Sequence, residues 1–528
     1  MNHRTELSVI VILCLITIFP LSASSKQKLW SSDSELVSQM QILYSVCGFA
    51  RSGHSGNVTT GELMYSLDYL KKECEQLSSD QLLLFEDIED KLKIRSDLVF
   101  SDDSSMDISL IYSFELYAHT NEQQVREEQL WHLQWPDRLP LISVPLTFSL
   151  FDTFYSSVDF VVTRRLLDYP DQSLYSSSVS TNHSLRDFFT LDLNWPYRAV
   201  AAAGGRQWNF QFGRAVLNMG PAYTGNLLIS DHLPYHDYAQ FRTWFGPLTF
   251  TAQGIGFPPP SETGEGDDTI KMLLTHRVDW NVTSSIRFSV TEAMMYQDAI
   301  LEPRFLNPMM IYHQYFMSDK SNSFLTAEMI VSLIPGLTIY GQAGVDEMQI
   351  LGESSSIPNA LGWQTGIEYA WLNKGSMVHI WAEFVHTDPY LYLRDGINYT
   401  VAFKNTQTYF TRYAGYPLGG DAQVLALGFE WDNSKNMKVF GSVQYSRKGE
   451  VTYDSSYPPE DSSVTTPTGV IQTTVRPSVG MRYVITPFYA GEIILKGEFS
   501  YLHIENVNNC ENDTLTDYQC SFSVSYSL

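Results

Sequence analysis

The stretch Trp363-Gln-Thr-Gly-Ile-Glu-Tyr-Ala-Trp371 decides the fold of this chain. Its odd-numbered positions are Trp, Thr, Ile, Tyr and Trp, and the positions between them are Gln, Gly, Glu and Ala. Successive side chains of a β-strand point to opposite faces, so the stretch predicts a strand with one mostly apolar face. A strand of about 9 to 11 residues is long enough to cross a membrane as part of a tilted barrel wall.

The same alternation recurs from about residue 95 to the C-terminus. It is clearest in residues 108–116, 189–195, 208–212, 248–252, 425–431, 439–445, 493–501 and 522–528. The apolar faces often end in Trp or Tyr, as the aromatic girdles of a membrane barrel do, and the opposite faces carry Ser, Thr, Gln, Glu, Arg and Gly, as a wet lumen would. A soluble β-sandwich also alternates, but its strands are shorter. We therefore predict an all-β fold, a transmembrane antiparallel β-barrel of about 18 strands, with 16 as the alternative, over residues 95–528.

The residues before the barrel have a different pattern. Residues 1–24 resemble a signal peptide, with Arg4, an apolar run and small residues at the end. Helix-capping patterns at 32–35, 59–62 and 78–81 then predict about three helices within residues 25–94. Together these features predict a protein of the outer membrane of a diderm bacterium, surrounded by outer-membrane lipid, with the helices in the periplasm.

The net charge argues against some partners, and the cysteine content suggests disulfide bonds. The chain of 528 residues has a net charge of −25, from 59 acidic and 34 basic residues. This charge argues against nucleic acid as a partner and against a polybasic contact with anionic lipid. Cys47, Cys74, Cys510 and Cys520 remain after the signal peptide, and Cys47–Cys74 and Cys510–Cys520 are the sequence-local disulfides, although spacing alone leaves the connectivity open.

The segment from Phe212 to Tyr238 is the densest in glycine, proline and polar side chains. It is either an ordered loop whose glycines only form turns or a surface for a polar ligand. The candidate ligand-binding residues in and beside it are Arg206, Arg214, Asn226, Asp231, His232 and Asp237.

Catalysis and metal binding are disfavoured for this segment. Ser230, Asp231 and His232 are adjacent, and adjacent residues do not converge as a catalytic triad does. Pro234 separates His232 from His236, so the two imidazoles do not share a helical face for a metal. We therefore expect no enzymatic activity, no metal and no cofactor.

The polar strand faces suggest a charged lumen. They carry Arg206, Arg214, Arg242, Arg277, Arg287 and Arg482 among Asp192, Asp279, Glu292, Glu368, Glu430 and Glu498. These residues either form an ion-pair network that stiffens the barrel or a ladder that recognises an anionic or hydroxylated polymer, with Tyr and Trp faces stacking on sugar rings.

Several motifs resemble the capsule-assembly Wzi-like outer-membrane family. They are Phe-Gly-Arg214, Met-Gly-Pro221, Thr-Gly-Asn-Leu-Leu-Ile-Ser-Asp231 and Tyr-His-Asp-Tyr238, the preceding Trp195-Pro196 and Gly205-Arg206, and Glu292 followed by Leu306-Asn307-Pro308. The resemblance spans residues 95–528 and is strongest over 195–313. It implies an 18-stranded barrel with a periplasmic helical bundle, and a lectin-like protein that binds surface or capsular polysaccharide and helps its assembly or attachment, with other export or assembly proteins as partners. The alternative function is an outer-membrane channel for small solutes.

Overall fold

The computed structural model describes residues 25–74, 76–93, 98–101, 104–120, 138–164, 179–182, 191–194, 198–257, 269–307, 310–312, 320–347, 359–393, 397–404, 409–455, 465–486 and 491–528. The predicted signal peptide, residues 1–24, lies outside these residues, as do Trp195 and Pro196. Within the described ranges, no helix is both long enough and apolar enough to cross a membrane.

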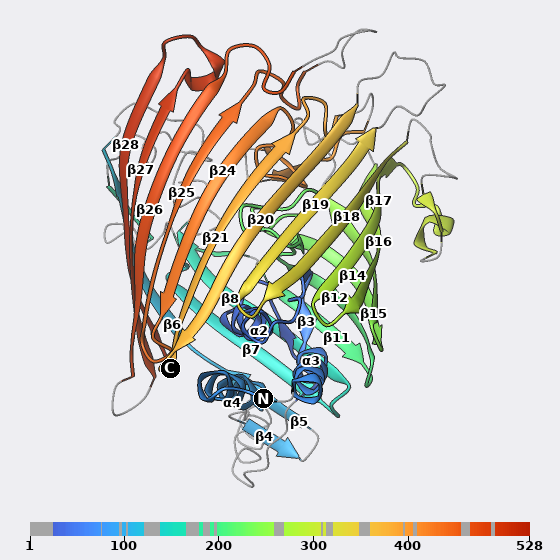
Figure 1. Ribbon diagram of the computed structural model, residues 1–528, viewed down its shortest axis with the longest axis vertical. Coiled ribbons are helices and arrows are strands. Elements are labelled where there is room, and N and C mark those ends of the chain that lie inside the picture. The colour runs from blue at the N-terminus through green and yellow to red at the C-terminus, as the bar shows by residue number, and fades with distance from the viewer. Residues whose placement is uncertain are drawn as a thin grey trace, which may run out of the picture.

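Eighteen antiparallel strands close into a barrel, and most wall neighbours are also neighbours in sequence (Figure 1). They are β6 (Ile111–His119), β7 (Ile142–Leu150), β8 (Phe154–Arg164), β11 (Ala199–Gly204), β12 (Trp208–Ala215), β14 (His236–Phe245), β15 (Leu248–Phe257), β16 (Ile270–Thr283), β17 (Ile286–Asp298), β18 (Ser321–Ile334), β19 (Leu337–Glu347), β20 (Ala360–Asn373), β21 (Ser376–Thr387), β24 (Ala422–Asp432), β25 (Met437–Lys448), β26 (Gln472–Ile485), β27 (Glu492–Glu505) and β28 (Thr514–Ser527). The barrel closes where β28 pairs with β6, from Gln519 opposite His119 to Ser527 opposite Ile111. The predicted transmembrane barrel of 18 strands is thus confirmed over the alternative of 16.

Short strands extend the wall or lie inside it. β4 (Leu98–Ser101), β5 (Ser104–Ile108), β9 (Val179–Thr181) and β10 (Leu191–Asn194) pair at the edges of β5 to β8. The remaining strands form three small two-stranded sheets: β1 (Leu29–Trp30) with β3 (Val58–Thr59), β2 (His54–Ser55) with β13 (Met219–Gly220), and β22 (Thr400–Lys404) with β23 (Tyr409–Tyr413).

Strand β20 contains the stretch that predicted the fold, and it alternates as expected. Trp363, Ile367 and Trp371 are 43%, 46% and 37% exposed on the outer face. Gln364 and Glu368 point into the barrel and are 3% and 2% exposed. A period of two therefore gives this strand a lipid-facing side and a lumen-facing side.

The N-terminal helices lie at one end of the barrel (Figure 1). The short turns of the wall touch them there: the backbone N–H of Gly336 donates to the carbonyl of Ser45 at 2.7 Å, and that of Lys374 donates to Asp80 Oδ2 at 3.2 Å. We call this end of the barrel the helix end.

Three helices make up the N-terminal region. They are α2 (Glu35–Val46), α3 (Thr60–Glu73) and α4 (Ser79–Leu92). Ser78 and Gln81 form a capping box at α4, and the Thr59 side chain accepts from the backbone of Glu62 at α3. The N-cap of the first helix is Ser34, two residues later than the pattern at 32–35 suggests, and it makes no side-chain capping hydrogen bond.

The four cysteines of the described chain are free thiols. Cys47 ends α2 and Cys74 ends α3, and both pack against the core of the helical region. Burial and the neighbouring Cys74 thiol raise the pKa of Cys47 to about 12. The structure thus places the first predicted cysteine pair together but does not join it.

Three segments fold into the barrel and form a plug: residues 48–59, residues 216–235, and the described part of residues 388–418 (Figure 1). The second segment is the loop between β12 and β14. Its Leu227 is fully buried, and its carbonyl accepts from Tyr392 Oη at 2.6 Å in the third segment. The first and second segments join through the pairing of β2 with β13. The Gly/Pro-rich loop therefore lies in the lumen and not along the rim.

Candidate functional site

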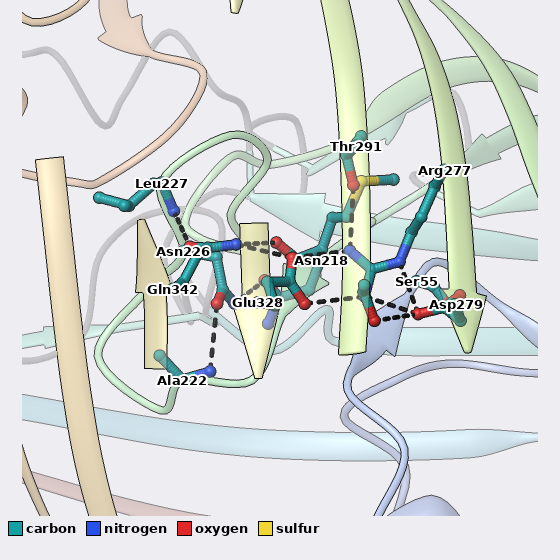
Figure 2. A network of polar contacts seen from close by, with 12 residues as sticks. Ser55, Asn218, Ala222, Asn226, Leu227, Arg277, Asp279, Thr291, Glu328 and Gln342 are labelled. Atoms are coloured by element: carbon teal, nitrogen blue, oxygen red, sulfur yellow. Dashed lines mark hydrogen bonds and ion pairs between the residues drawn. The ribbon is translucent and has the colours of Figure 1, made fainter. Parts of the chain in front are cut away.

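Asn226 is a hub that holds the second plug segment to the wall (Figure 2). Its Oδ1 accepts from the backbone of Ala222 at 3.1 Å and from Gln364 at 3.3 Å, and its Nδ2 donates to Asn218 at 2.7 Å. The residue is fully buried. Because each of these bonds fixes a backbone or a wall position, Asn226 acts as a structural residue of the plug.

Buried ion pairs stand between the plug and the wall. Arg277 donates to both carboxylate oxygens of Glu328, at 2.6 and 2.8 Å, and to Asp279 at 3.0 Å (Figure 2). Glu328 in turn accepts from Gln342, whose Oε1 accepts from the backbone of Leu227 at 2.8 Å. A buried charge needs such partners to offset its loss of water. Here the chain of hydrogen bonds runs from Arg277 through Glu328 and Gln342 to the plug backbone at Leu227.

The N-terminal segment is anchored by further buried arginines. Arg51 donates to Glu368 at 2.6 Å and to the carbonyl of Pro221 at 2.8 Å, so it links the first and second plug segments to β20. Arg242 donates to Glu62 at 2.6 Å and ties β14 to α3. These contacts correspond to the predicted ion-pair network that stiffens the barrel.

The structure divides the charged residues that were predicted for the lumen. Arg242, Arg277, Arg287, Asp279 and Glu368 are buried on the inner side, and Glu430, Arg482 and Glu498 are partly exposed there. The prediction that Glu292 faces the lumen is wrong. Glu292 pairs with Leu325, which is 47% exposed on the outer face, so Glu292 lies on the outside of the wall. The strand of Asp192 is described, but not its side chain.

The six candidate ligand-binding residues lie in three places. Arg206 is exposed in the turn between β11 and β12, at the helix end. Arg214 and Asp237 form a bidentate pair across β12 and β14, at 2.7 and 2.8 Å, with the Arg214 guanidinium 4.0 Å from the centre of the Tyr235 ring. Asp237 has the parity of the exposed Phe241, so this pair lies on the outer side of the wall.

The other three residues belong to the plug. Asp231 is exposed and accepts from Asn218 at 3.1 Å, so Asn218 connects it to the buried Asn226. His232 Nε2 lies 3.0 Å from the carbonyl of Tyr413. The structure therefore groups Asn226 with Asp231, and Arg214 with Asp237, but it does not bring all six residues to one surface, and their role in ligand binding stays a prediction.

His232 is held as a neutral, structural imidazole. Burial and, less strongly, His236 lower the pKa of His232 to about 3 against the opposing effect of the Tyr413 carbonyl. His236 accepts from the backbone of Leu217, and Ser230 Oγ accepts from that of Asn226. Within the described ranges, no three His, Cys, Asp or Glu residues are grouped to hold a metal ion. Ser230, His232 and His236 thus each form a hydrogen bond to the backbone of the plug.

A second inner surface was not found from the sequence. It consists of Trp381, Phe440, Ser442, Gln444, Arg476 and Ser478, all inward-facing and partly exposed. We call these six residues the lumenal strip. They are neighbours by register: Trp381 pairs with Gly428, Gly428 with Ser442, and Ser442 with Ser478, while Gln444 pairs with Arg476 one row farther from the helices.

Two aromatic rings of the lumenal strip lie flat against the wall because glycines lie beneath them. A Cβ at Gly428 would be 2.0 Å from Cε2 of Trp381, and a Cβ at Gly480 would be 2.5 Å from Cζ of Phe440. Trp381 also stacks on Tyr223 of the plug, with ring centroids 5.1 Å apart. The strip therefore begins where the plug ends.

Polar groups continue the lumenal strip beside these rings. The hydroxyls of Ser442 and Ser478 are 2.9 Å apart, and Arg476 donates to Gln444 at 2.9 Å. Hydroxyl, amide and guanidinium groups next to flat rings can hydrogen-bond and stack on a sugar. A sequence signal was available for Phe440, which is a large aromatic residue on an otherwise polar strand face, whereas Trp381 shares its face with Met377 and Val385.

Comparison with known proteins shows a similarity of fold. No protein-family model matches the chain, and no curated protein sequence matches it. Among solved structures, it is similar to Wzi of Escherichia coli, described as an outer membrane protein involved in group 1 capsule assembly and as a carbohydrate-binding β-barrel, with a TM-score of 0.57 at 14% identity over 94% of this chain and 98% of that one. It is also similar to OccK5 (OpdH) of Pseudomonas aeruginosa, with a TM-score of 0.43 at 10% identity over 81% of this chain and 99% of that one. The likeness to Wzi shows that the chain has the fold of an outer-membrane barrel.

Proposed function

We propose that this protein is a non-enzymatic outer-membrane barrel that binds a glycan at the lumenal strip. The observation that carries the proposal is the flat Trp381 and Phe440 rings beside the partly exposed Ser442, Ser478 and Arg476. Ring faces stack on sugar rings, and the polar groups bond to hydroxyls or carboxylates. These groups remain partly exposed, although Tyr223 of the plug stacks on Trp381, whereas polar groups of β16 to β20 such as Arg277 and Glu328 are buried.

Surface or capsular polysaccharide is the ligand class that we favour. The motifs around Arg214 and Glu292 resemble the Wzi-like family, and the barrel has the fold of a protein described as carbohydrate-binding. By the same reasoning we place the barrel in outer-membrane lipid, the cleaved signal peptide at residues 1–24 and the helices in the periplasm, where export or assembly proteins could reach them. An oxidising periplasm would also favour a Cys47–Cys74 bond.

The experiment compares one aromatic residue on each side of the wall. Phe440→Ala removes a lumen-facing ring, and Phe429→Ala removes a ring that is 43% exposed on the outer face. Binding of the purified proteins to a panel of purified bacterial polysaccharides is measured by biolayer interferometry. We expect Phe440→Ala, and likewise Trp381→Ala, to weaken binding about tenfold, roughly 1.4 kcal/mol, with Phe429→Ala unchanged.

Variants of the ligand-binding residues predicted from the sequence test whether the glycan binds elsewhere. If Arg214→Ala with Asp231→Ala abolishes polysaccharide binding or surface retention of the polymer, and Phe440→Ala does not, then the glycan binds outside the lumenal strip. No binding by the unaltered protein to any polysaccharide of the panel would contradict the proposed function itself.

A channel for small solutes is the second candidate. The small Ser442 and Ser478 on the lumenal strip favour it, since small side chains narrow a lumen least. Planar-bilayer recording separates the two functions: a steady open conductance of the unaltered protein would favour transport, and silence would favour the plugged glycan-binding barrel.

A further inference from the structure

The outer face of β16 and β17 changes character partway along the strands. Near the helix end, Val278, Trp280 and Phe288 are 45%, 45% and 38% exposed, as lipid-facing residues are. Farther along the same face, Leu274 and Met294 are only 2% and 1% exposed. Because side chains alternate with a period of two, these residues lie on one side of the wall, and something other than lipid covers the second group.

The cover is the segment that follows β17, which we call the strap: residues 299–307 and 310–312. Its Phe305 packs on Tyr296 with ring centroids 4.8 Å apart, and Tyr296 Oη donates to the carbonyl of Ile300 at 2.5 Å. Its Tyr312 stacks on His276 with centroids 4.6 Å apart. Figure 1 shows the coil of the strap, in yellow-green, outside the wall next to β16 and β17.

The strap also covers a polar pair on the outer face. His276 lies opposite Glu292 in the ladder between β16 and β17, and Tyr312 Oη lies 2.9 Å from His276 Nε2. On its other side Glu292 pairs with Leu325, which is 47% exposed on the outer face. A carboxylate at this level would otherwise face hydrocarbon, where charge is costly.

The level of the strap follows from the neighbouring strand. Leu325 is the last apolar residue on the outer face of β18 in the direction away from the helices, and Ser323 and Ser321 come next on that face. Met294 and Tyr296, which the strap covers, are opposite these two serines. The strap therefore lies where the apolar band of the barrel gives way to polar surface.

The strap exposes three large apolar side chains beside the exposed Arg304, which pairs with Glu302, and Asn307. Ile300, Leu306 and Ile311 are 72%, 54% and 52% exposed. Surface residues of this kind, continuous with a lipid-facing wall and at the edge of its apolar band, fit the membrane–water boundary. We propose that the strap lies in the membrane leaflet at the end away from the helices, with Ile300, Leu306 and Ile311 in contact with lipid acyl chains.

The experiment measures whether labels on the strap meet lipid or water. The three variants Ile300→Cys, Leu306→Cys and Ile311→Cys are made in full-length protein with Cys47, Cys74, Cys510 and Cys520 replaced by Ser. Each receives a nitroxide label and is reconstituted in phosphatidylcholine liposomes. Leu325→Cys is the lipid-facing control, and Asp454→Cys, at an exposed loop position, is the water-facing control. Collision rates with oxygen and with a water-soluble nickel chelate are read by electron paramagnetic resonance.

We expect the strap labels to collide with oxygen several-fold more than with the chelate, as the Leu325→Cys label does. Labels at all three strap positions that behave like the Asp454→Cys label would overturn the proposal. The three positions are independent, so one variant that fails to fold leaves two that decide. The readout does not depend on a glycan, and its result stands whether or not the lumenal strip binds one.

Discussion

Two parts of the wall share one sequence pattern and differ in what they face. From β16 to β20 the inward polar residues, such as Arg277 and Glu328, are buried in ion pairs that end on the plug. Along β25 and β26 inward residues such as Ser442 and Gln444 are partly exposed. We call these the plug-bound wall and the open wall. Polar residues that face a lumen can therefore either hold a plug or remain available to a ligand, according to what lies opposite them.

The largest expected difference concerns stability. Arg277→Met leaves Glu328 buried without its cation and Asp279 with only Arg287 at 3.4 Å, so the free energy of unfolding should fall by about 3–5 kcal/mol. Arg476→Met on the open wall loses a bond to Gln444 in a partly exposed position, and should cost only about 1 kcal/mol. Urea unfolding in detergent, followed by heat-modifiable migration in gels, checks both values. Equal losses would mean that the two walls do not differ in this way.

The next effect concerns closure of the lumen. Asn226→Ala removes the acceptor of the Ala222 N–H and the donor to Asn218. The plug should lose about 1–3 kcal/mol of stability, because these buried groups are left without hydrogen-bond partners. The plug segment should then leave its position part of the time, and planar bilayers should show intermittent conductance that the unaltered protein lacks. Asp454→Ala, in an exposed loop, is the matched control and should stay silent. Silence of Asn226→Ala as well would show that this hub does not keep the lumen closed.

The barrel was predictable from sequence because its signal is periodic and local. Trp363 to Trp371 already contains the alternation that places Glu368 in the lumen. The two walls were not distinguishable in that way, because the partner of Glu368 is Arg51, more than 300 residues earlier in the chain. Strand alternation specifies a side of the wall, but not whether a plug covers it.

The candidate site shows the same limit. Glu292 was assigned to the lumen from its polar character, yet the strap covers it on the outer face because Tyr312 and Phe305 pack there. Arg214 follows Gly213, which has a φ of 135°, and its pair with Asp237 on the neighbouring strand was not evident from spacing. The Gly/Pro-rich loop was correctly singled out as ordered, but its polar groups bind one another and the wall.

A smaller effect tests the flat ring of the open wall. Gly480→Val places side-chain atoms where the Phe440 ring lies, since a Cβ there would be 2.5 Å from Phe440 Cζ. The ring should tilt into the lumen and polysaccharide affinity should fall about tenfold. Gly497→Val is the control, because a Cβ at Gly497 meets its nearest neighbour at 4.0 Å. Unchanged affinity in Gly480→Val, with folding intact, would contradict a role for the flat ring.

The smallest effect concerns the response of the plug to acid. Burial holds the pKa of His232 at about 3, below the ordinary value of 6.5, so the unfolded or undocked loop takes up a proton first as pH falls. The stability that comes from neutral His232 is complete above about pH 6.5 and declines as the pH falls below it. Bilayer conductance should therefore rise between pH 6.5 and pH 4. His232→Gln, which keeps a donor near the Tyr413 carbonyl but does not titrate, should flatten that rise. If the rise persists unchanged in His232→Gln, then another group, on the wall or on the plug, sets the acid response.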